Sequence, residues 1–224
     1  GVPTIPYRET IGGKADVRYR HKKQTGGAGQ FGEVAIRLFP NERGAGFEFR
    51  NKIVGGVIPG ALIPSVEKGV RHQLEQGILA GFPVIDSVVE LYDGKTHPVD
   101  SKDIAFQIAG RQAIKKAVMD AKPILLEPIY LVEVTCPEEN VGDIMGDMNQ
   151  RRARISSMEG KGRNNIVKAS VPLAEMMNYA PSLKSMTGGK GSYSMQFGSY
   201  EPVPHSMQDK LVQEVNRLKA GDDD

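Results

Sequence analysis

Hydrophobic and polar residues alternate along several short stretches of this chain, beginning with residues 16–22 and 33–38. A period of two is typical of a strand with one buried face. We therefore expect strands there, a further strand that starts at Phe47, and another over residues 85–91. Asp93-Gly94 is predicted to turn the chain after the last of these strands.

Two other stretches of this half have the spacing of helices. Hydrophobic residues recur at every fourth position over residues 66–78, which predicts an amphipathic helix that Gly77 helps to end. A second helix is expected to start at an N-cap formed by Asp100 or Ser101 and to run to about residue 121. The residues expected on its core-facing side are Ile104, Ala105 and Ile108.

The second half of the chain has a simpler order of elements. The pattern predicts a strand at residues 129–135, a helix at 137–150 and two strands at 155–159 and 166–171. A short helix is expected after Pro172, and a final strand at residues 192–197. The order βαββαβ is that of the ferredoxin-like fold. A last amphipathic helix is expected over residues 207–218.

Two prolines, Pro123 and Pro128, flank a short hydrophobic segment between the two halves. Prolines are expected where a helix stops and an extended segment starts. We therefore predict an α+β protein with domains at residues 1–124 and 125–203. Residues 204–224 are expected to form a C-terminal helix and an acidic tail.

Composition narrows the class of protein only slightly. The net charge is +2, and no run approaches the roughly 18 apolar residues of a membrane helix. The single cysteine, Cys136, excludes an internal disulfide and indicates a reducing compartment. We expect a cytoplasmic monomer that does not bind membranes.

The sequence offers no catalytic constellation. Gly160-Lys161 and Gly189-Lys190 are each followed by glycine where a phosphate-binding loop needs a serine or threonine hydroxyl. The histidines are scattered, without the paired Cys or His ligands of a zinc site. They are His21, His72, His97 and His205. We expect no enzyme activity, metal or cofactor in this chain.

Two loops and two basic clusters remain as candidates for binding. The loops lie at residues 25–30 and 93–98, and their candidate RNA-binding residues are Gly26, Gly27, Gly29, Gln30, Lys95 and His97. Dense glycines permit either a flexible hairpin tip or close approach to a partner. The first basic cluster comprises Lys14, Arg18, Arg20, Lys22 and Lys23. The second comprises Arg151, Arg152 and Arg154, followed by Lys161, Arg163 and Lys168. Each cluster suits either a phosphate backbone or a solvated charged face.

Several longer sequence motifs resemble those of a known protein family. The segments that resemble domain IV of elongation factor G are Lys23-Gln24-Thr25-Gly26-Gly27-Ala28-Gly29-Gln30, Asn51-Lys52-Ile53-Val54-Gly55-Gly56-Val57-Ile58-Pro59 and Leu91-Tyr92-Asp93-Gly94 with His97. Those that resemble domain V are Leu125-Leu126-Glu127-Pro128, Gly142-Asp143-Ile144-Met145-Gly146-Asp147 and Arg151-Arg152. The resemblance covers nearly the whole chain.

This resemblance implies a fold and a role. Domain IV of the family is ribosomal-protein-like, with a left-handed βαβ crossover, and domain V is ferredoxin-like. The resemblance implies that the two loops reach the decoding region of the small ribosomal subunit and contact tRNA and mRNA during translocation. It also implies that Arg151, Arg152 and Arg154 contact rRNA of the large subunit, near the stalk base and the sarcin–ricin loop. GTP and magnesium belong to a GTPase domain of the family that is absent from this sequence.

Two alternatives stay open at this point. Ala28, Pro98 and the pair Lys95-Thr96 depart from the family's usual loop residues, as in a paralogue that recycles ribosomes or protects them from a drug. An RNA-processing enzyme with the same fold is the other alternative, and the lack of a metal-binding cluster argues against it.

Overall fold

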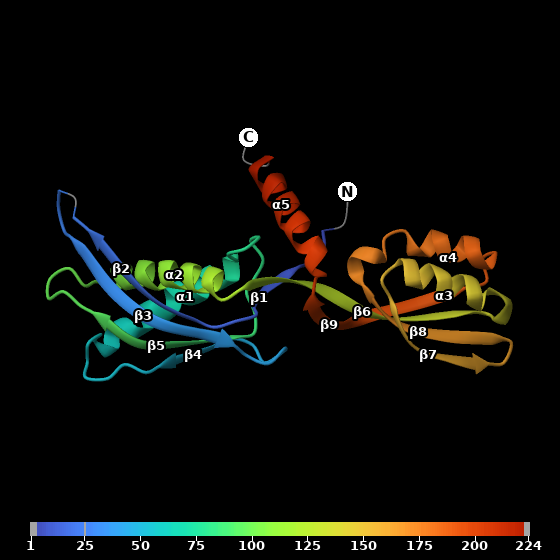
Figure 1. The fold of residues 1–224 in the computed structure, drawn as a ribbon, viewed down its shortest axis with the longest axis horizontal. Helices are drawn as coiled ribbons and strands as arrows, with labels where there is room; N and C mark the ends of the chain where they lie inside the picture. Colours follow the sequence, from blue (N-terminus) through green and yellow to red (C-terminus); the bar gives the residue numbers. More distant parts are fainter. Residues whose placement is uncertain (1–3, 25, 222–224) are drawn as a thin grey trace. The chain divides into compact units, whose positions relative to one another are not determined.

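The computed structural model describes residues 4–24 and 26–221, which form two compact units (Figure 1). The first unit comprises residues 8–126 and 202–221, and the second comprises residues 4–7 and 127–201. The chain passes from one to the other after Leu126, inside the hydrophobic segment that the two prolines flank. The first-loop residue Thr25 and the three aspartates of the expected acidic tail lie outside the described residues.

The first unit contains a four-stranded sheet of order β2-β3-β5-β4. Its strands are β2 (Ala15–Lys23), β3 (Gln30–Pro40), β4 (Glu48–Asn51) and β5 (Ser87–Lys95). Neighbouring strands are antiparallel except β4 and β5, which are parallel and are joined through a 3₁₀ turn (Gly60–Leu62) and helix α1 (Ile63–Gln76). This connection is a βαβ unit, because parallel neighbours need a crossover.

Helices α1 and α2 (Asp103–Asp120) cover one face of this sheet (Figure 1). The alternation of β3 places Val34 and Ile36 in the core, where they pack with hydrophobic residues of both helices such as Val66 and Phe106. Gly77 ends α1 with a positive φ of 82°, and its N–H donates to the carbonyl of Gln73. Glycine suits this helix end because it has no side chain to clash in that conformation.

Two further elements complete the first unit. Strand β1 (Arg8–Ile11) pairs with the first four residues of β6 (Pro123–Pro137), and the hydrophobic pattern did not predict it. Helix α5 (His205–Gly221) confirms the expected last helix. The Gln208 side chain accepts the N–H of Leu125, and Lys219 donates to the carbonyl of Ala80 at 2.8 Å.

The second unit confirms the ferredoxin-like prediction. After β6 come a 3₁₀ turn (Glu138–Asn140), α3 (Val141–Gln150), β7 (Arg154–Lys161), β8 (Asn164–Pro172), a 3₁₀ turn (Leu173–Glu175), α4 (Tyr179–Thr187) and β9 (Ser192–Pro202). The sheet order is β9-β6-β8-β7, with α3 and α4 together on one face (Figure 1). Val132, Val134 and Cys136 of β6 point into this core, with Ile144 and Met148 of α3.

Three local predictions were wrong. Asp93-Gly94 does not turn the chain but continues β5 beyond a bulge, opposite Ala35 and Val34 of β3. The N-cap of α2 is Lys102 rather than Asp100 or Ser101. Ile104 is 42% exposed and Ile108 is only partly buried, because the buried stripe of α2 runs through Ala105, Phe106 and Ala109 instead.

Candidate nucleic-acid interface

The two loops expected to bind RNA lie side by side at one end of the first unit. They are the β2–β3 connection, residues 24–29, and the β5–α2 connection, residues 96–102. The N–H of Phe31 donates to the carbonyl of Asp100 at 2.9 Å, and the Ser101 hydroxyl donates to the carbonyl of Phe31 at 2.9 Å. We call these two connections the tip loops.

Gly29 allows this close approach. A side-chain carbon at position 29 would lie 2.9 Å from the Asp100 carboxylate, closer than nonbonded atoms tolerate. Gly26 and Gly27 are exposed, and Gly26 has a positive φ of 34°. The glycines thus serve two purposes, since Gly29 packs the loops together while Gly26 and Gly27 leave bare backbone at the surface.

A hydrogen bond fixes the backbone of His97, and its side chain is half exposed to solvent. Its N–H donates to the Ser101 hydroxyl at 2.7 Å, and its side chain is 52% exposed. The ring centroid lies 6.1 Å from that of Phe31, and Nδ1 lies 3.6 Å from the Asp100 carboxylate. An imidazole positioned in this way can stack on a base or donate to a phosphate.

Gln30 and Lys95 lie in strands and not in the loops themselves. Gln30 is the first residue of β3, and its side-chain oxygen lies 2.9 Å from Nε2 of His21. Lys95 is the exposed last residue of β5, opposite Glu33 of β3. The structure therefore places both residues where the strands meet the tip loops, with the amide of Gln30 already engaged.

A buried carboxylate binds two arginines of the first basic cluster. Glu33, whose side chain is 4% exposed, accepts hydrogen bonds from Arg18 and Arg20 at 2.8 and 2.7 Å. Burial alone would raise the pKa of Glu33, but hydrogen bonds from the two arginines outweigh it and hold the pKa below its ordinary value. Arg18 also pairs with Asp93. The exposed lysines near the tip loops, Lys22, Lys23 and Lys95, form no ion pair with the described residues.

A third loop lies beside the second tip loop. Residues 52–59 follow β4, and the Thr96 hydroxyl donates to the carbonyl of Val57 at 3.3 Å. Ile58 is buried against Gly94, where a side-chain carbon would lie 2.6 Å from its Cδ1. Gly55 and Gly56 have positive φ and nothing near them. Lys52 is exposed and precedes a Gly-Gly pair, as Lys23 precedes Gly26-Gly27 in the first tip loop.

In the second unit, Arg151 is bound inside the protein. Its side chain is 14% exposed, and Nε lies 2.9 Å from the Asp147 carboxylate. The other guanidinium nitrogens donate to the carbonyls of Glu175 and Met177 and to the Ser182 hydroxyl. All three of its nitrogens have partners, so Arg151 links the end of α3 to the segment before α4 and to α4 itself; its predicted contact with rRNA stays a prediction.

Arg152 is also engaged. It forms two hydrogen bonds to Glu127, at 2.9 and 3.3 Å, and a third to Glu175 at 2.9 Å. Burial alone lowers the pKa of Arg152, but the hydrogen bonds to the two carboxylates raise it above its ordinary value. Arg154, at the start of β7, is exposed and forms no ion pair with the described residues. Of the three arginines predicted to contact RNA, Arg154 is therefore exposed, whereas Arg151 and Arg152 are hydrogen-bonded to groups of the protein itself.

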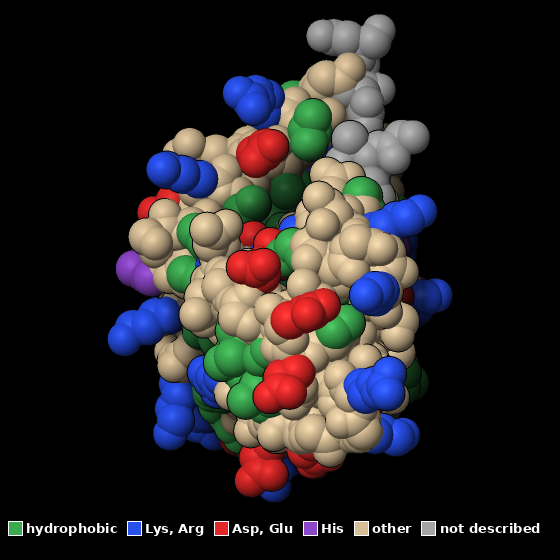
Figure 2. All heavy atoms as spheres, turned by 90° about the vertical axis from the view of Figure 1, so that its right-hand side faces the viewer, with side chains coloured by type: hydrophobic (Ala, Val, Ile, Leu, Met, Phe, Trp, Pro, Cys, Tyr) green, Lys and Arg blue, Asp and Glu red, His purple; other side chains and the backbone are tan. Residues whose placement is uncertain are grey.

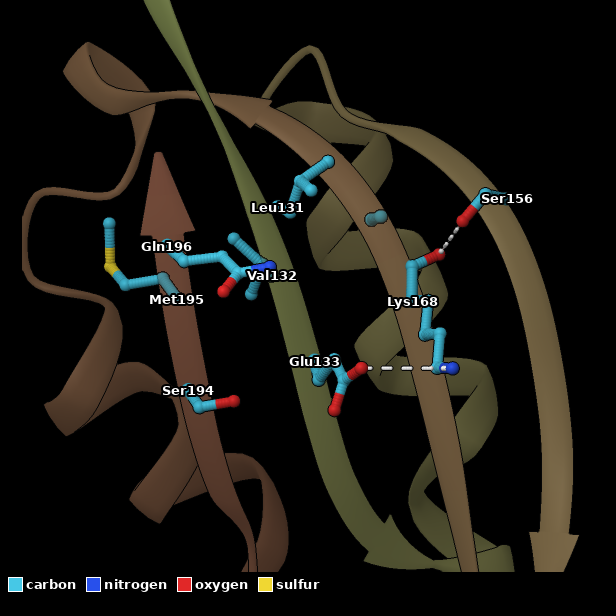
Figure 3. Close-up of a pocket in the computed structure, with 9 residues that line it drawn as sticks. Leu131, Val132, Glu133, Ser156, Lys168, Ser194, Met195 and Gln196 are labelled. Atoms are coloured by element: carbon cyan, nitrogen blue, oxygen red, sulfur yellow. Dashed lines mark hydrogen bonds and ion pairs between the residues drawn. The ribbon is translucent and has the colours of Figure 1, made fainter. Parts of the chain in front are cut away.

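The remaining basic residues of this cluster are similarly divided. Lys168 lies 3.7 Å from Glu133 beside a hollow of about 340 Å³ on the open face of the sheet, and its carbonyl accepts the Ser156 hydroxyl (Figure 3). Lys161 and Arg163 are exposed in the β7–β8 hairpin. The face shown in Figure 2 intersperses acidic and basic side chains instead of gathering the basic ones together.

Comparison with known proteins identifies the family. The family model described as elongation factor G, domain IV, matches residues 3–122, and that of the elongation factor G C-terminus matches residues 124–211. The chain belongs to the elongation factor G family. This confirms the resemblance inferred from the loop and domain V motifs.

Two relatives match this chain along nearly its whole length. An elongation factor G-like protein of Thermotoga maritima is 53% identical over 218 residues, which are 97% of this chain and 32% of that protein. A crystal structure of a protein from Thermus thermophilus has 44% identity and a TM-score of 0.87, again over 97% of this chain and 32% of the other. The chain thus spans about a third of the length of these two relatives.

The described residues contain no group of three or more His, Cys, Asp or Glu side chains arranged to hold a metal ion. None of their helices is both long and apolar enough to cross a membrane.

Proposed function

We propose that this chain is the ribosome-contacting C-terminal portion of a translational GTPase that promotes the movement of tRNA and mRNA. The observation that carries the proposal is the hydrogen bonding of Asp100 and Ser101, in the β5–α2 tip loop, to Phe31 at the start of β3. A β5–α2 loop fixed in this way has less conformational freedom to lose on binding, which lowers the entropy cost of contacting a partner.

In this proposal the tip enters the decoding region of the small subunit. Lys22, Lys23 and Lys95 neutralise RNA phosphates, and His97 stacks on a base or donates to a phosphate. The bare backbone at Gly26 and Gly27 lies against RNA. Occupying the A site prevents tRNA from moving backward. The energy comes from hydrolysis of GTP, which is bound with magnesium by another part of the longer protein, and this chain needs no cofactor of its own.

The second unit is proposed to face the large subunit, near the stalk base and the sarcin–ricin loop. Since Arg151 and Arg152 are engaged internally, the contact is assigned to Arg154 and to the basic residues of the β7–β8 hairpin, Lys161 and Arg163. We propose a monomer that works in the cytoplasm. A recycling or ribosome-protecting paralogue is the alternative. The departures at Ala28, Pro98 and Lys95-Thr96 are its support, but the tip-loop sequence as a whole looks closer to that of the translocase.

The test is a kinetic comparison in the full-length factor. His97→Ala is expected to slow translocation about tenfold or more while ribosome-stimulated GTP hydrolysis stays nearly unchanged, because His97 acts at the tip and not at the nucleotide. His205→Ala, which removes an exposed histidine at the start of α5, is the matched control. Normal translocation in the His97 variant would contradict the proposed role of the tip.

A further inference from the structure

Two glycines bring α1 and α2 into direct backbone contact. A side-chain carbon at Gly69 would lie 2.1 Å from the carbonyl oxygen of Gln107, and one at Gly110 would lie 2.6 Å from that of Val66. No other residue type fits at either position without moving a helix. The side chains that flank this crossing consequently stand close together on the outer surface of the helix pair.

An open hollow of about 540 Å³ lies along this crossing, and we call it the helix groove. Its lining is drawn from both helices, and the long side chains that line it expose apolar stems as well as polar ends. The basic side chains in it are Lys68, Arg71, His72 and Arg111, and the acidic ones are Glu67 and Glu75. None of these residues belongs to the tip loops.

Only part of this charge is neutralised inside the protein. Arg71 lies 3.1 Å from Glu67 and stacks over the ring of Phe47. Lys68, His72 and Arg111 form no ion pair with the described residues. The Nε atom of Arg111 is buried and has no hydrogen-bond acceptor among them. Because a buried donor without an acceptor is unfavourable, this N–H is suited to an acceptor that arrives from outside.

We propose that the helix groove binds a phosphodiester of an RNA strand, with Arg111 as the central donor and with Lys68 and His72 beside it. A guanidinium offers parallel donors that match phosphate oxygens, the charge of Lys68 adds attraction, and a ring N–H of His72 can donate a further hydrogen bond. The inference takes its partner class from the proposed function, yet it adds a contact on the helical side of the first unit, separate from the tip.

The lining favours RNA over an acidic protein segment. Protein partners generally need a hydrophobic or aromatic anchor in a pocket, whereas Pro64 supplies the only apolar side chain among the described residues that line this groove. A nucleic-acid backbone needs no such anchor, because charge and hydrogen bonding supply its affinity.

The test is an NMR titration of this chain with a short single-stranded oligouridylate. The Arg111 Nε–H signal, assigned by comparison with Arg111→Lys, is expected to shift on addition of RNA. Arg111→Gln is expected to weaken binding about tenfold. It should also reduce the slope of log affinity against log salt by about 0.7, the loss of one phosphate contact on a single strand.

Two variants separate this inference from the proposed function. Lys116→Gln removes an equal charge from an exposed position of α2 outside the groove, and binding should change little. In a Lys95→Gln/His97→Ala variant the Arg111 signal should still shift. If only NMR signals of the tip loops shift, the inference that RNA binds in the helix groove is wrong, while the proposed function is unaffected. The absence of any shift, or a larger response of Arg111 to an oligoglutamate peptide than to RNA, would also overturn it.

Discussion

At the scale of single residues, arginine has two distinct uses in this chain, and sequence alone does not separate them. Arg151, Arg152 and Arg154 fall together in the sequence, yet only Arg154 is exposed. The i, i+4 spacing of Asp147 and Arg151 on one helix was a readable sign of an internal pair. The partner of Arg152, Glu127, is distant in sequence, so only the fold could show that pair.

The Arg152–Glu127 pair is expected to stabilise the second unit. Arg152→Ala leaves the Glu127 carboxylate, 3% exposed, without its bidentate partner. Removing one member of a buried pair costs about 3 kcal/mol in the free energy of unfolding, measurable by urea denaturation. Arg154→Ala, the exposed control, should change it by less than about 0.5 kcal/mol. Equal effects of the two substitutions would show that the pair adds no stability.

Glu33 is expected to make the first unit sensitive to acid. Its folded-state pKa is lowered from an ordinary value of 4.5, so the carboxylate stabilises the fold fully above that pH. The contribution is lost as pH falls through the lowered pKa. Unfolding curves at a series of pH values should therefore show a smaller acid loss in Glu33→Gln than in the parent chain. An unchanged pH profile in that variant would assign the acid sensitivity to other carboxylates.

At the scale of elements, the glycines decide how closely the parts approach. Gly94 illustrates this best, because a side-chain carbon there would lie 2.3 Å from the carbonyl oxygen of Glu33. It is a glycine required by packing inside a strand, although the dipeptide Asp93-Gly94 has the sequence of a turn. Gly69 and Gly110 are likewise required by packing, because they let the backbones of α1 and α2 come into contact.

Gly69→Ala is expected to destabilise the first unit by about 3 kcal/mol, because the added methyl group must push α1 away from the Gln107 carbonyl. Gly142→Ala is the matched control, since it adds the same group in α3 where nothing lies within 4 Å. There the better helix propensity of alanine should stabilise by up to about 1 kcal/mol. Thermal unfolding measures both, and a neutral Gly69→Ala would mean that the helices can move apart at little cost.

Periodicity predicted the longer elements well and the short or distant pairings poorly. The strands and helices with a repeated hydrophobic face were found because burial of that face decides their period. Strand β1 was missed because its four residues are too few for a period and its partner, β6, lies far along the chain. Glycine density and charge pointed to the tip loops, and the family resemblance gave them a role. Only the structure showed that Asp100 and Ser101 bond to the start of β3.

At the scale of the whole molecule, each unit has a hydrophobic core of its own, and α5 hydrogen-bonds within the first unit through Gln208 and Lys219. Deleting residues 205–224 should therefore lower the melting temperature of the first unit and leave the second unit closed. Cys136 reports on the second unit, since it is fully buried there and burial raises the pKa of its thiol. Its rate of alkylation at a fixed pH should be the same in the truncated and full chains, whereas hydrogen exchange in β1 and α1 should speed up. Faster alkylation of Cys136 after truncation would instead show that the two units unfold as one, with β6, the strand common to both, transmitting the loss.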